Sequence, residues 1–167
     1  KDDEASKREL SKLEQKYTLG KVNFDSVIII DFGNSLKSVL ASLVFADVNE
    51  EDVLFTTVNQ WFDESIFYEN SVKSLYYPSI NFDNFKKHNN KYYKTFQLYP
   101  NEITILAYDA LGLIYYVWNK NKGINSINDF FLKEKIKGKI GSFNFNEKKV
   151  TQELKIYKAE NKKFKEF

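Results

Sequence analysis

The 167-residue sequence contains no cysteine and no methionine, and its only histidine is His88. The lack of cysteine excludes disulfide bonds, thiolate metal sites and cysteine nucleophiles. His88 lies in a stretch rich in lysine and asparagine with no serine or cysteine constellation beside it, so we expect no catalytic role for it. The sequence also has no run of 18 apolar residues, which excludes a transmembrane helix.

Arginine is nearly absent, because Arg8 is the only one among 25 basic residues. Acidic residues number 23, and the formal net charge at pH 7 is only +2. Surfaces that bind nucleic acids favour arginine and patches of one sign of charge, and neither is visible. Lysines that are mixed with acidic residues are typical of a solvated surface. We therefore expect no nucleic-acid partner.

Signatures of catalysis are missing as well. The sequence has no Walker loop, no GxGxxG motif and no GxSxG motif. Asp63 and Glu64 are carboxylates, but adjacent residues on one loop rarely share acid–base work, and no second half of such a site is visible. We expect that the chain is not an enzyme and that it holds neither a metal nor a cofactor.

The first residues, KDDEASKREL, are charged and contain no apolar segment of the kind that a signal peptide requires. The chain also begins without methionine. We therefore expect a processed or partial chain, and the missing signal peptide does not argue for the cytoplasm.

Apolar side chains are abundant, since 43% of the residues are hydrophobic and 17% are aromatic, so the chain can bury a sizeable core. Residues 26–58 have the pattern of a β-α-β unit. Val27–Ile30 is a continuous β-branched run, typical of a parallel strand buried on both faces. A helix with a leucine and valine stripe follows, and then a second strand at 53–58. Such a unit is parallel and right-handed almost by rule.

The remaining segments alternate between helix and strand patterns. Residues 3–17 are strong helix formers. After residue 58 we expect a strand at 72–77 that is stopped by Pro78, helices at 81–97, 103–118 and 126–132, and antiparallel strands at 139–145, 150–157 and 163–167 with a turn at Glu147–Lys149. The long helix is predicted to face inward with Ile103, Ala107, Ala110, Leu111, Ile114 and Val117.

Polar and aromatic side chains gather where the predicted parallel strands end. In open α/β sheets, ligands bind outside the carboxyl ends of the strands. Aromatic walls combined with oriented hydrogen-bonding groups suit a small polar ligand. The candidate ligand-binding residues are Phe32, Asn34, Ser35, Asn59, Gln60, Trp61, Asp63 and Tyr77. The alternative stays open that these are polar loops with aromatics packed beneath them, and Trp61 in particular is either a cleft wall or a core residue.

The order of the segments resembles a known family. Tyr108-Asp109-Ala110 in a long apolar helix, followed by the stretch GKIGSFNF at 138–145 and a terminal hairpin, is similar to the carboxyl-terminal half of type I periplasmic binding proteins. These are the substrate-binding components of branched-chain amino-acid and related ABC transporters. The stretches TVNQWFDES at 57–65 and LYYP at 75–78 resemble a branch of that family known as penicillin-binding-protein activators.

The resemblance implies an α/β fold in which two lobes close on a ligand about a hinge. Residues 1–80 would form part of the second lobe as a parallel β-α-β sheet. Residues 81–137 would return to the first lobe as crossover helices, and residues 138–167, with an antiparallel hairpin, would cross back. The opening run of βα units of the first lobe would be missing, so we expect exposed apolar surface.

The function that the resemblance implies is capture of a small, polar, amino-acid-like ligand in the cleft between the lobes, for delivery to an ABC permease. The location would be the bacterial periplasm, with membrane anchoring through the missing amino-terminal segment. The alternative is a regulator that transports nothing and activates a cell-wall synthase by protein contact.

Overall fold

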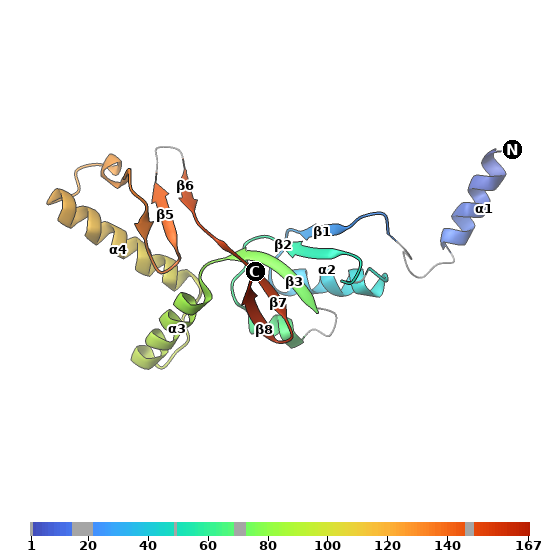
Figure 1. The fold of residues 1–167 in the computed structure, drawn as a ribbon, viewed down its shortest axis with the longest axis horizontal. Helices are drawn as coiled ribbons and strands as arrows, with labels where there is room; N and C mark the ends of the chain where they lie inside the picture. Colours follow the sequence, from blue (N-terminus) through green and yellow to red (C-terminus); the bar gives the residue numbers. More distant parts are fainter. Residues whose placement is uncertain (1, 15–21, 49, 69–72, 146–148) are drawn as a thin grey trace. The chain divides into compact units, whose positions relative to one another are not determined.

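The computed structural model describes residues 2–14, 22–48, 50–68, 73–145 and 149–167. The fold is mixed α/β, as the sequence predicts, and the chain forms two compact units (Figure 1). Unit 1 comprises Lys1–Tyr77 and Lys158–Lys165, and unit 2 comprises Pro78–Tyr157 and Glu166–Phe167. The assignment of residues 1–80, 81–137 and 138–167 to lobes of a larger protein stays a prediction.

Most residues of a five-stranded sheet, in the order β1-β2-β3-β7-β8, belong to unit 1. The strands are β1 (Ser26–Ile29), β2 (Leu54–Thr57), β3 (Ser74–Ser79), β7 (Lys155–Glu160) and β8 (Lys163–Glu166). Helix α2 (Gly33–Phe45) connects β1 to β2, and these two strands pair in parallel from Ser26↔Leu54 to Ile29↔Thr57. β2 and β3 are also parallel. The predicted β-α-β unit is therefore confirmed. Two further elements of this unit are α1 (Asp2–Glu14) and the 3₁₀ helix η1 (Glu64–Tyr68).

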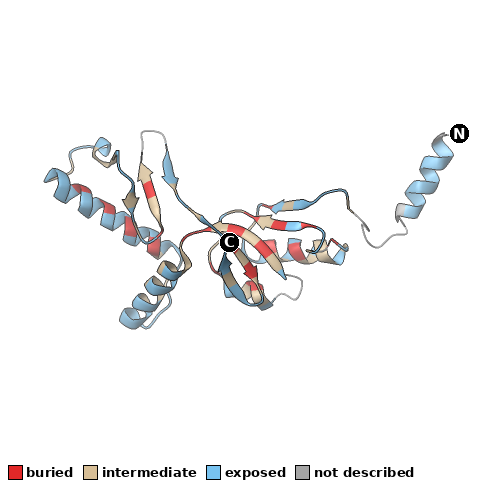
Figure 2. Cartoon of the chain, in the orientation of Figure 1, coloured by how far each residue is buried: buried red, intermediate tan, exposed pale blue. Residues whose placement is uncertain are grey.

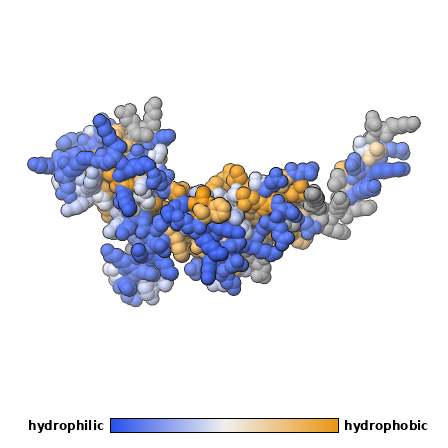
Figure 3. Space-filling view, in the orientation of Figure 1, coloured by the Kyte–Doolittle hydropathy of each residue, from blue (hydrophilic) through white to orange (hydrophobic). Residues whose placement is uncertain are grey.

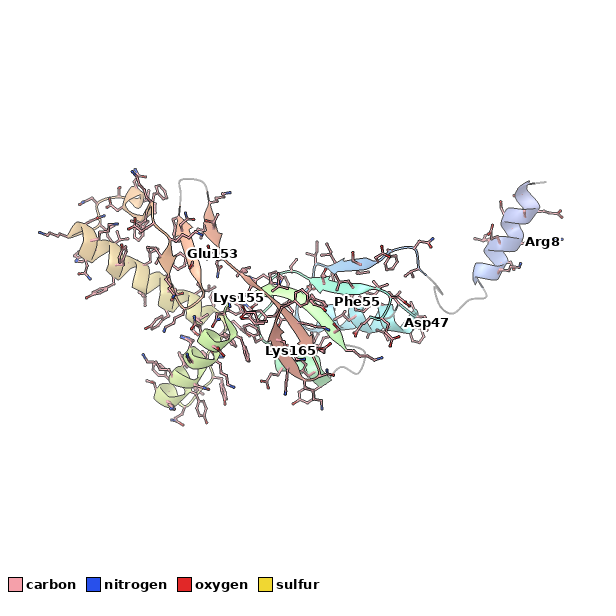
Figure 4. The ribbon with its side chains drawn as sticks, viewed as in Figure 1. Arg8, Asp47, Phe55, Glu153, Lys155 and Lys165 are labelled. Carbon is pink, nitrogen blue, oxygen red and sulfur yellow. The ribbon has the colours of Figure 1, made fainter. Side chains whose placement is uncertain are left out.

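The sheet of unit 1 buries one face only. Ile29 is 6% exposed, whereas its neighbour Ile28 is 70% exposed. The same alternation continues in β2, where Phe55, labelled in Figure 4, is buried and Leu54 is exposed. Figure 2 colours the chain by burial. Leu36 and Leu40 of α2 join Ile29 and Phe55 in the core. The prediction that the β-branched run is buried on both faces is therefore wrong. Hydrophobic side chains gather over β1 and β2 on the surface (Figure 3).

Strand β3 does not stop at Pro78, as the sequence predicted, but runs on to Ser79. Proline lacks a backbone N–H and is tolerated in a strand where no ladder hydrogen bond is required of it. Burial alternates along β3, with Leu75, Tyr77 and Ser79 on the buried face. Tyr77 therefore lies inside the strand and not beyond its end.

Unit 2 combines two long helices with a small antiparallel sheet. Its helices are α3 (Phe82–Phe96), α4 (Ile103–Asn121) and the 3₁₀ helix η2 (Ile127–Phe130), and its sheet has the order β4 (Ile136–Lys137), β5 (Ser142–Phe145), β6 (Val150–Gln152). Both strand pairs are antiparallel; the β5–β6 pair is the predicted hairpin, whereas β4 was not predicted. The Asn81 side chain accepts a 2.9 Å hydrogen bond from the N–H of Asn84, which caps the start of α3. Lys122 ends α4 in the left-handed conformation, with φ 55°.

The buried stripe of α4 is not the one that the sequence predicts. The buried residues are Ile105, Asp109, Leu113 and Val117, each one turn from the next. Of the six residues predicted to face inward only Val117 is buried; the five exposed ones are Ile103, Ala107, Ala110, Leu111 and Ile114. The helix is apolar on more than one side, so periodicity alone fits two stripes. The polar Asp109 decides between them through a contact that is distant in sequence.

Several predicted features fall outside the described residues. The end of the first predicted helix, residues 15–17, is among them, as are Val72 at the start of the third predicted strand and Glu147 and Lys148 of the predicted hairpin turn. Within the ranges that the structure describes, no helix is both long and apolar enough to cross a membrane.

Candidate functional site

The ends of β1 and β2 lie side by side and are tied together by Gln60. Ile29 pairs with Thr57, so the loops that follow these strands start at the same edge of the sheet. The Gln60 side-chain amide donates hydrogen bonds to the Asp31 carbonyl oxygen at 2.9 Å and to Thr57 Oγ1 at 3.2 Å. Thr57 Oγ1 in turn donates to the Ile29 carbonyl oxygen at 2.6 Å. This strand-end clamp, formed by Gln60 and Thr57, holds the two candidate loops together.

The first loop presents a helix start to solvent. Gly33 has φ +53°, a conformation that glycine adopts without strain, and this lets α2 begin immediately after Phe32. Phe32 makes no side-chain capping hydrogen bond, and Phe32, Asn34 and Ser35 are all exposed. The first backbone N–H groups of a helix carry a partial positive charge and bind anions. The loop therefore offers an apolar surface, two polar side chains and an anion-favouring helix start.

The second loop is shaped by Asp63. Its two carboxylate oxygens accept hydrogen bonds from the Ser65 backbone N–H at 2.9 Å and from Ser65 Oγ at 2.6 Å. Lys37 of α2 donates to the same Ser65 Oγ at 3.0 Å. A further hydrogen bond, from the Asp63 N–H to the Trp61 carbonyl oxygen at 3.0 Å, tightens the turn. Asp63 thus positions the loop, since both of its oxygens already accept hydrogen bonds.

The remaining candidates of this region, Asn59, Trp61 and Tyr77, differ in burial. Trp61 is half-buried and Asn59 is exposed, so both lie at the surface of the loop. Tyr77 is only 2% exposed and its ring lies 6.3 Å from that of Phe62, which in turn stacks edge-on against Phe164 at 5.3 Å. Tyr77 therefore belongs to the core, because β3 turns its side chain inward. Phe62 and Phe164, which the sequence did not single out, support the loop from below.

The structure accordingly places seven of the eight predicted residues on the segments that follow the paired ends of β1 and β2: Phe32, Asn34, Ser35, Asn59, Gln60, Trp61 and Asp63. It adds Thr57 and Lys37 as supporting residues. The sequence did not indicate Thr57, because a threonine within a strand gives no functional signal. It did not indicate Lys37, because this residue lies 28 positions from its partner Ser65. Across the ranges that the structure describes, no group of three or more His, Cys, Asp and Glu side chains is arranged to hold a metal.

The Tyr-Asp-Ala motif has a structural role in unit 2. The Asp109 carboxylate is buried and accepts 2.8 Å hydrogen bonds from the backbone N–H groups of Lys139 and Ile140. A Cβ on Gly138 would lie 2.3 Å from Asp109 Oδ2, so only glycine fits there. The motif and the glycine-containing stretch at 138–145 thus contact each other directly.

His88, the only histidine, lies on α3 beside α4. Its Nε2 is 3.3 Å from Thr104 Oγ1, and its ring meets that of Tyr108 edge-on at 5.8 Å. Burial lowers the pKa of the imidazole, and Lys139 and Lys91 lower it further, whereas Asp109 opposes them. The hydroxyl of Thr104 itself donates to the Asn101 carbonyl oxygen at 2.7 Å.

No protein-family model matches the chain. A search of curated proteins likewise finds no match. Solved structures do resemble it. An extracellular ligand-binding receptor from Desulfohalobium retbaense aligns with 86% of this chain and 26% of its own length, at a TM-score of 0.61 and 13% identity. A leucine-binding protein, LivK, from Thermotoga maritima aligns with 87% of this chain and 44% of its own, at a TM-score of 0.55 and 13% identity.

The chain thus spans 26% and 44% of the lengths of these two structures. At 13% identity the likeness concerns the fold and not the ligand. With its parallel β-α-β sheet, two long helices and antiparallel strands, this chain shares the mixed α/β fold of the matching parts of these type I periplasmic-binding-protein-like structures.

Proposed function

We propose that the chain serves in an extracytoplasmic solute-binding protein that captures a small, polar, amino-acid-like ligand for uptake by an ABC-type permease. The observation that carries this proposal is the strand-end clamp, in which Gln60 joins the ends of β1 and β2. It fixes two loops with hydrogen-bonding and aromatic side chains at the edge of the sheet where α/β proteins bind ligands. The proposed location is the periplasm.

The chemistry of the two loops suits an amino acid. A carboxylate is favoured at the start of α2, where the backbone N–H groups following Phe32 have no side-chain cap. Asn34 and Asn59 carry both donors and acceptors, and Phe32 and Trp61 supply apolar surface. The loops contain no histidine and no cysteine, and the carboxylate of Asp63 is occupied by Ser65. These groups suit binding without turnover.

The names of the two similar structures agree with this proposal, since one is a ligand-binding receptor and the other a leucine-binding protein. Their length is also relevant. A cleft between two lobes buries a ligand on both sides, and this chain covers 26% and 44% of those structures. We therefore propose that the strand-end residues form one wall of a cleft, and that other residues of the whole protein form the facing wall.

The proposal is tested by a thermal-shift screen of the full-length protein against amino acids and short peptides. A ligand that binds the folded state raises its melting temperature. We expect at least one amino acid to do so, and we expect Trp61→Ala to weaken its binding while the fold is kept. Phe62→Ala is the core control, and its loss of about 3–5 kcal/mol is typical of a large-to-small change in a core. If Trp61→Ala loses stability in the same way and leaves the affinity unchanged, Trp61 is a core residue.

The second candidate is a regulator that contacts a cell-wall synthase and transports nothing. Each unit taken by itself has exposed apolar residues, such as Ile28 in unit 1 and Leu111 and Trp118 in unit 2, and these favour it, because exposed apolar patches mark protein-contact sites. The discriminating result is the absence of a thermal shift with every small molecule, combined with retention of a purified cell-wall synthase on the immobilised full-length protein.

A further inference from the structure

Unit 2 contains a groove of about 600 Å³ between α4 and the segment that leads through β4. This volume lies within the range of ligand sites for small molecules. The residues that matter for its chemistry are Asn84, Tyr108, Gly112, Tyr116, Lys137 and Lys139. The groove lies wholly in unit 2 and shares no residue with the strand-end clamp of unit 1.

Two tyrosine rings flank the groove, and a glycine forms its floor. Tyr108, Gly112 and Tyr116 follow each other at four-residue spacing on α4, so the tyrosines are about 12 Å apart along the helix axis. A Cβ on Gly112 would meet no atom within 4 Å, which shows that the floor is open. The tyrosines are 49% and 40% exposed, so parts of both side chains remain accessible.

The two rings are held in place by their neighbours. The Tyr116 hydroxyl donates a 3.0 Å hydrogen bond to Glu134 Oε1, and the Lys120 ammonium lies 5.6 Å from the Tyr116 ring centroid. The Tyr108 ring packs against that of His88. Rings that are fixed before binding lose little conformational entropy when a flat molecule stacks on them.

The charge of the groove is positive. Its acidic side chains are already engaged: Glu134 pairs with Lys120, and Asp109 accepts from two backbone N–H groups. Lys135 pairs with Glu153, which is labelled in Figure 4. By contrast, Lys137 and Lys139 form no ion pair with any residue that the structure describes. Counting the lining lysines Lys135, Lys137 and Lys139 against the lining carboxylates Asp109 and Glu134 leaves an excess of one positive charge, which favours an anionic group on the ligand.

We propose that this groove is a second ligand site, for a small molecule that combines a flat ring with an anionic group. The ring stacks against the tyrosines over Gly112, and the anion is attracted by Lys137 and Lys139. Asn84, at the α3 side, adds a polar side chain with both donor and acceptor atoms. The site does not depend on the proposed solute-binding function, because its residues come from other elements.

Adenosine 5′-monophosphate is a suitable probe, with adenosine and ribose 5-phosphate as matched compounds that lack the anion and the ring. The chain has six glycines, so the Gly112 and Gly138 amide signals are readily followed in ¹H–¹⁵N NMR spectra of the whole chain. We expect saturable shifts of both signals with the nucleotide, and weaker binding of each partial compound. No saturable shift at millimolar nucleotide would overturn the proposal.

Substitutions on α4 distinguish binding of the nucleotide in the groove from binding elsewhere on the chain. Gly112→Leu fills the open floor, and we expect it to lower nucleotide affinity by about tenfold or more. The same change raises helix propensity, so the melting temperature should rise while binding is lost. Ala107→Leu, on an exposed position of the same helix outside the groove, is the control and should leave binding unchanged. Equal affinity of Gly112→Leu and wild type would contradict the site.

The lysines provide an independent test that does not rely on the helix. In the Lys137→Gln, Lys139→Gln double variant, affinity for the nucleotide should fall while affinity for adenosine stays the same. Lys133→Gln and Lys122→Gln, two exposed lysines outside the groove, form the matched control and should change neither affinity. If both double variants weaken nucleotide binding alike, the binding reflects overall charge and the proposal fails.

Discussion

At the scale of single residues, the chain depends on a few polar side chains that reach across long stretches of sequence. Gln60 contacts the Asp31 carbonyl oxygen 29 positions away, and Asp109 binds the N–H groups of residues 30 and 31 positions further on. Such contacts satisfy buried or half-buried backbone groups, which are costly to leave unpaired. Where the hydrophobic pattern of a helix or strand fits more than one face, such contacts determine which face is buried.

The contact between Asp109 and Gly138 predicts a strong coupling. Asp109→Ala should destabilise the fold by about 2–3 kcal/mol, since two hydrogen bonds to a buried carboxylate are lost. Gly138→Ala should also destabilise it, because its Cβ would lie 2.3 Å from Asp109 Oδ2. In the double variant the alanine at 138 meets no carboxylate, so the sum of the single effects should exceed the measured effect. Urea unfolding of the four proteins checks this, and simple additivity would contradict the contact.

The environment of His88 predicts how the stability of the fold depends on pH. The folded-state pKa of His88 is lowered, first by burial and then by Lys139 and Lys91. The unfolded chain therefore binds the proton more readily, and His88 contributes stability above its ordinary pKa that is lost as the pH falls. A ¹H NMR titration of the imidazole should give a pKa below the ordinary value. Unfolding of His88→Gln should lack this part of the pH dependence, and a raised pKa in the wild type would contradict the contacts.

At the scale of elements, sequence patterns predicted which segments form helices and strands but not which faces they bury. The alternation of β5–β6 and the β-branched run of β1 depend on neighbouring residues, so they are visible in the sequence. Burial depends on what lies opposite. Ile28 and Ile29 have the same side chain and opposite environments, and α4 is apolar around much of its circumference. Tyr77 was placed at a strand end because Pro78 was expected to stop β3, which it does not.

The two neighbouring isoleucines allow a direct test of one-sided burial. Ile29→Thr places a hydroxyl in the core of unit 1 and should cost about 2–4 kcal/mol, in the range of disruptive core changes. Ile28→Thr makes the identical change on the exposed face and should stay within about 0.5 kcal/mol. Threonine is a good strand former, so propensity does not confuse the comparison. Equal losses in chemical denaturation would show that both faces are covered.

At the scale of the whole molecule, the fold was predictable because the order of elements is distinctive even where each motif is weak. Two solved structures that share only 13% identity with this chain align with 86% and 87% of it, at TM-scores of 0.61 and 0.55. The candidate site was predictable in part, because strand ends can be located from the sequence. The clamp of Gln60 and Thr57 was not, since it depends on the register of β1 against β2.

Binding of a small polar ligand by the loops that the strand-end clamp holds can be measured through the fluorescence of Trp61. The chain has two tryptophans, so Trp118→Phe leaves Trp61 as the only indole fluorophore. In the full-length protein carrying this change, we predict that an amino acid that raises the melting temperature also produces a saturable change in Trp61 fluorescence. We predict further that Gln60→Ala, which removes the clamp, weakens that response by about tenfold or more. If no such ligand changes the Trp61 fluorescence, or if the Gln60→Ala variant responds with the same affinity, these loops do not bind the ligand through the clamp.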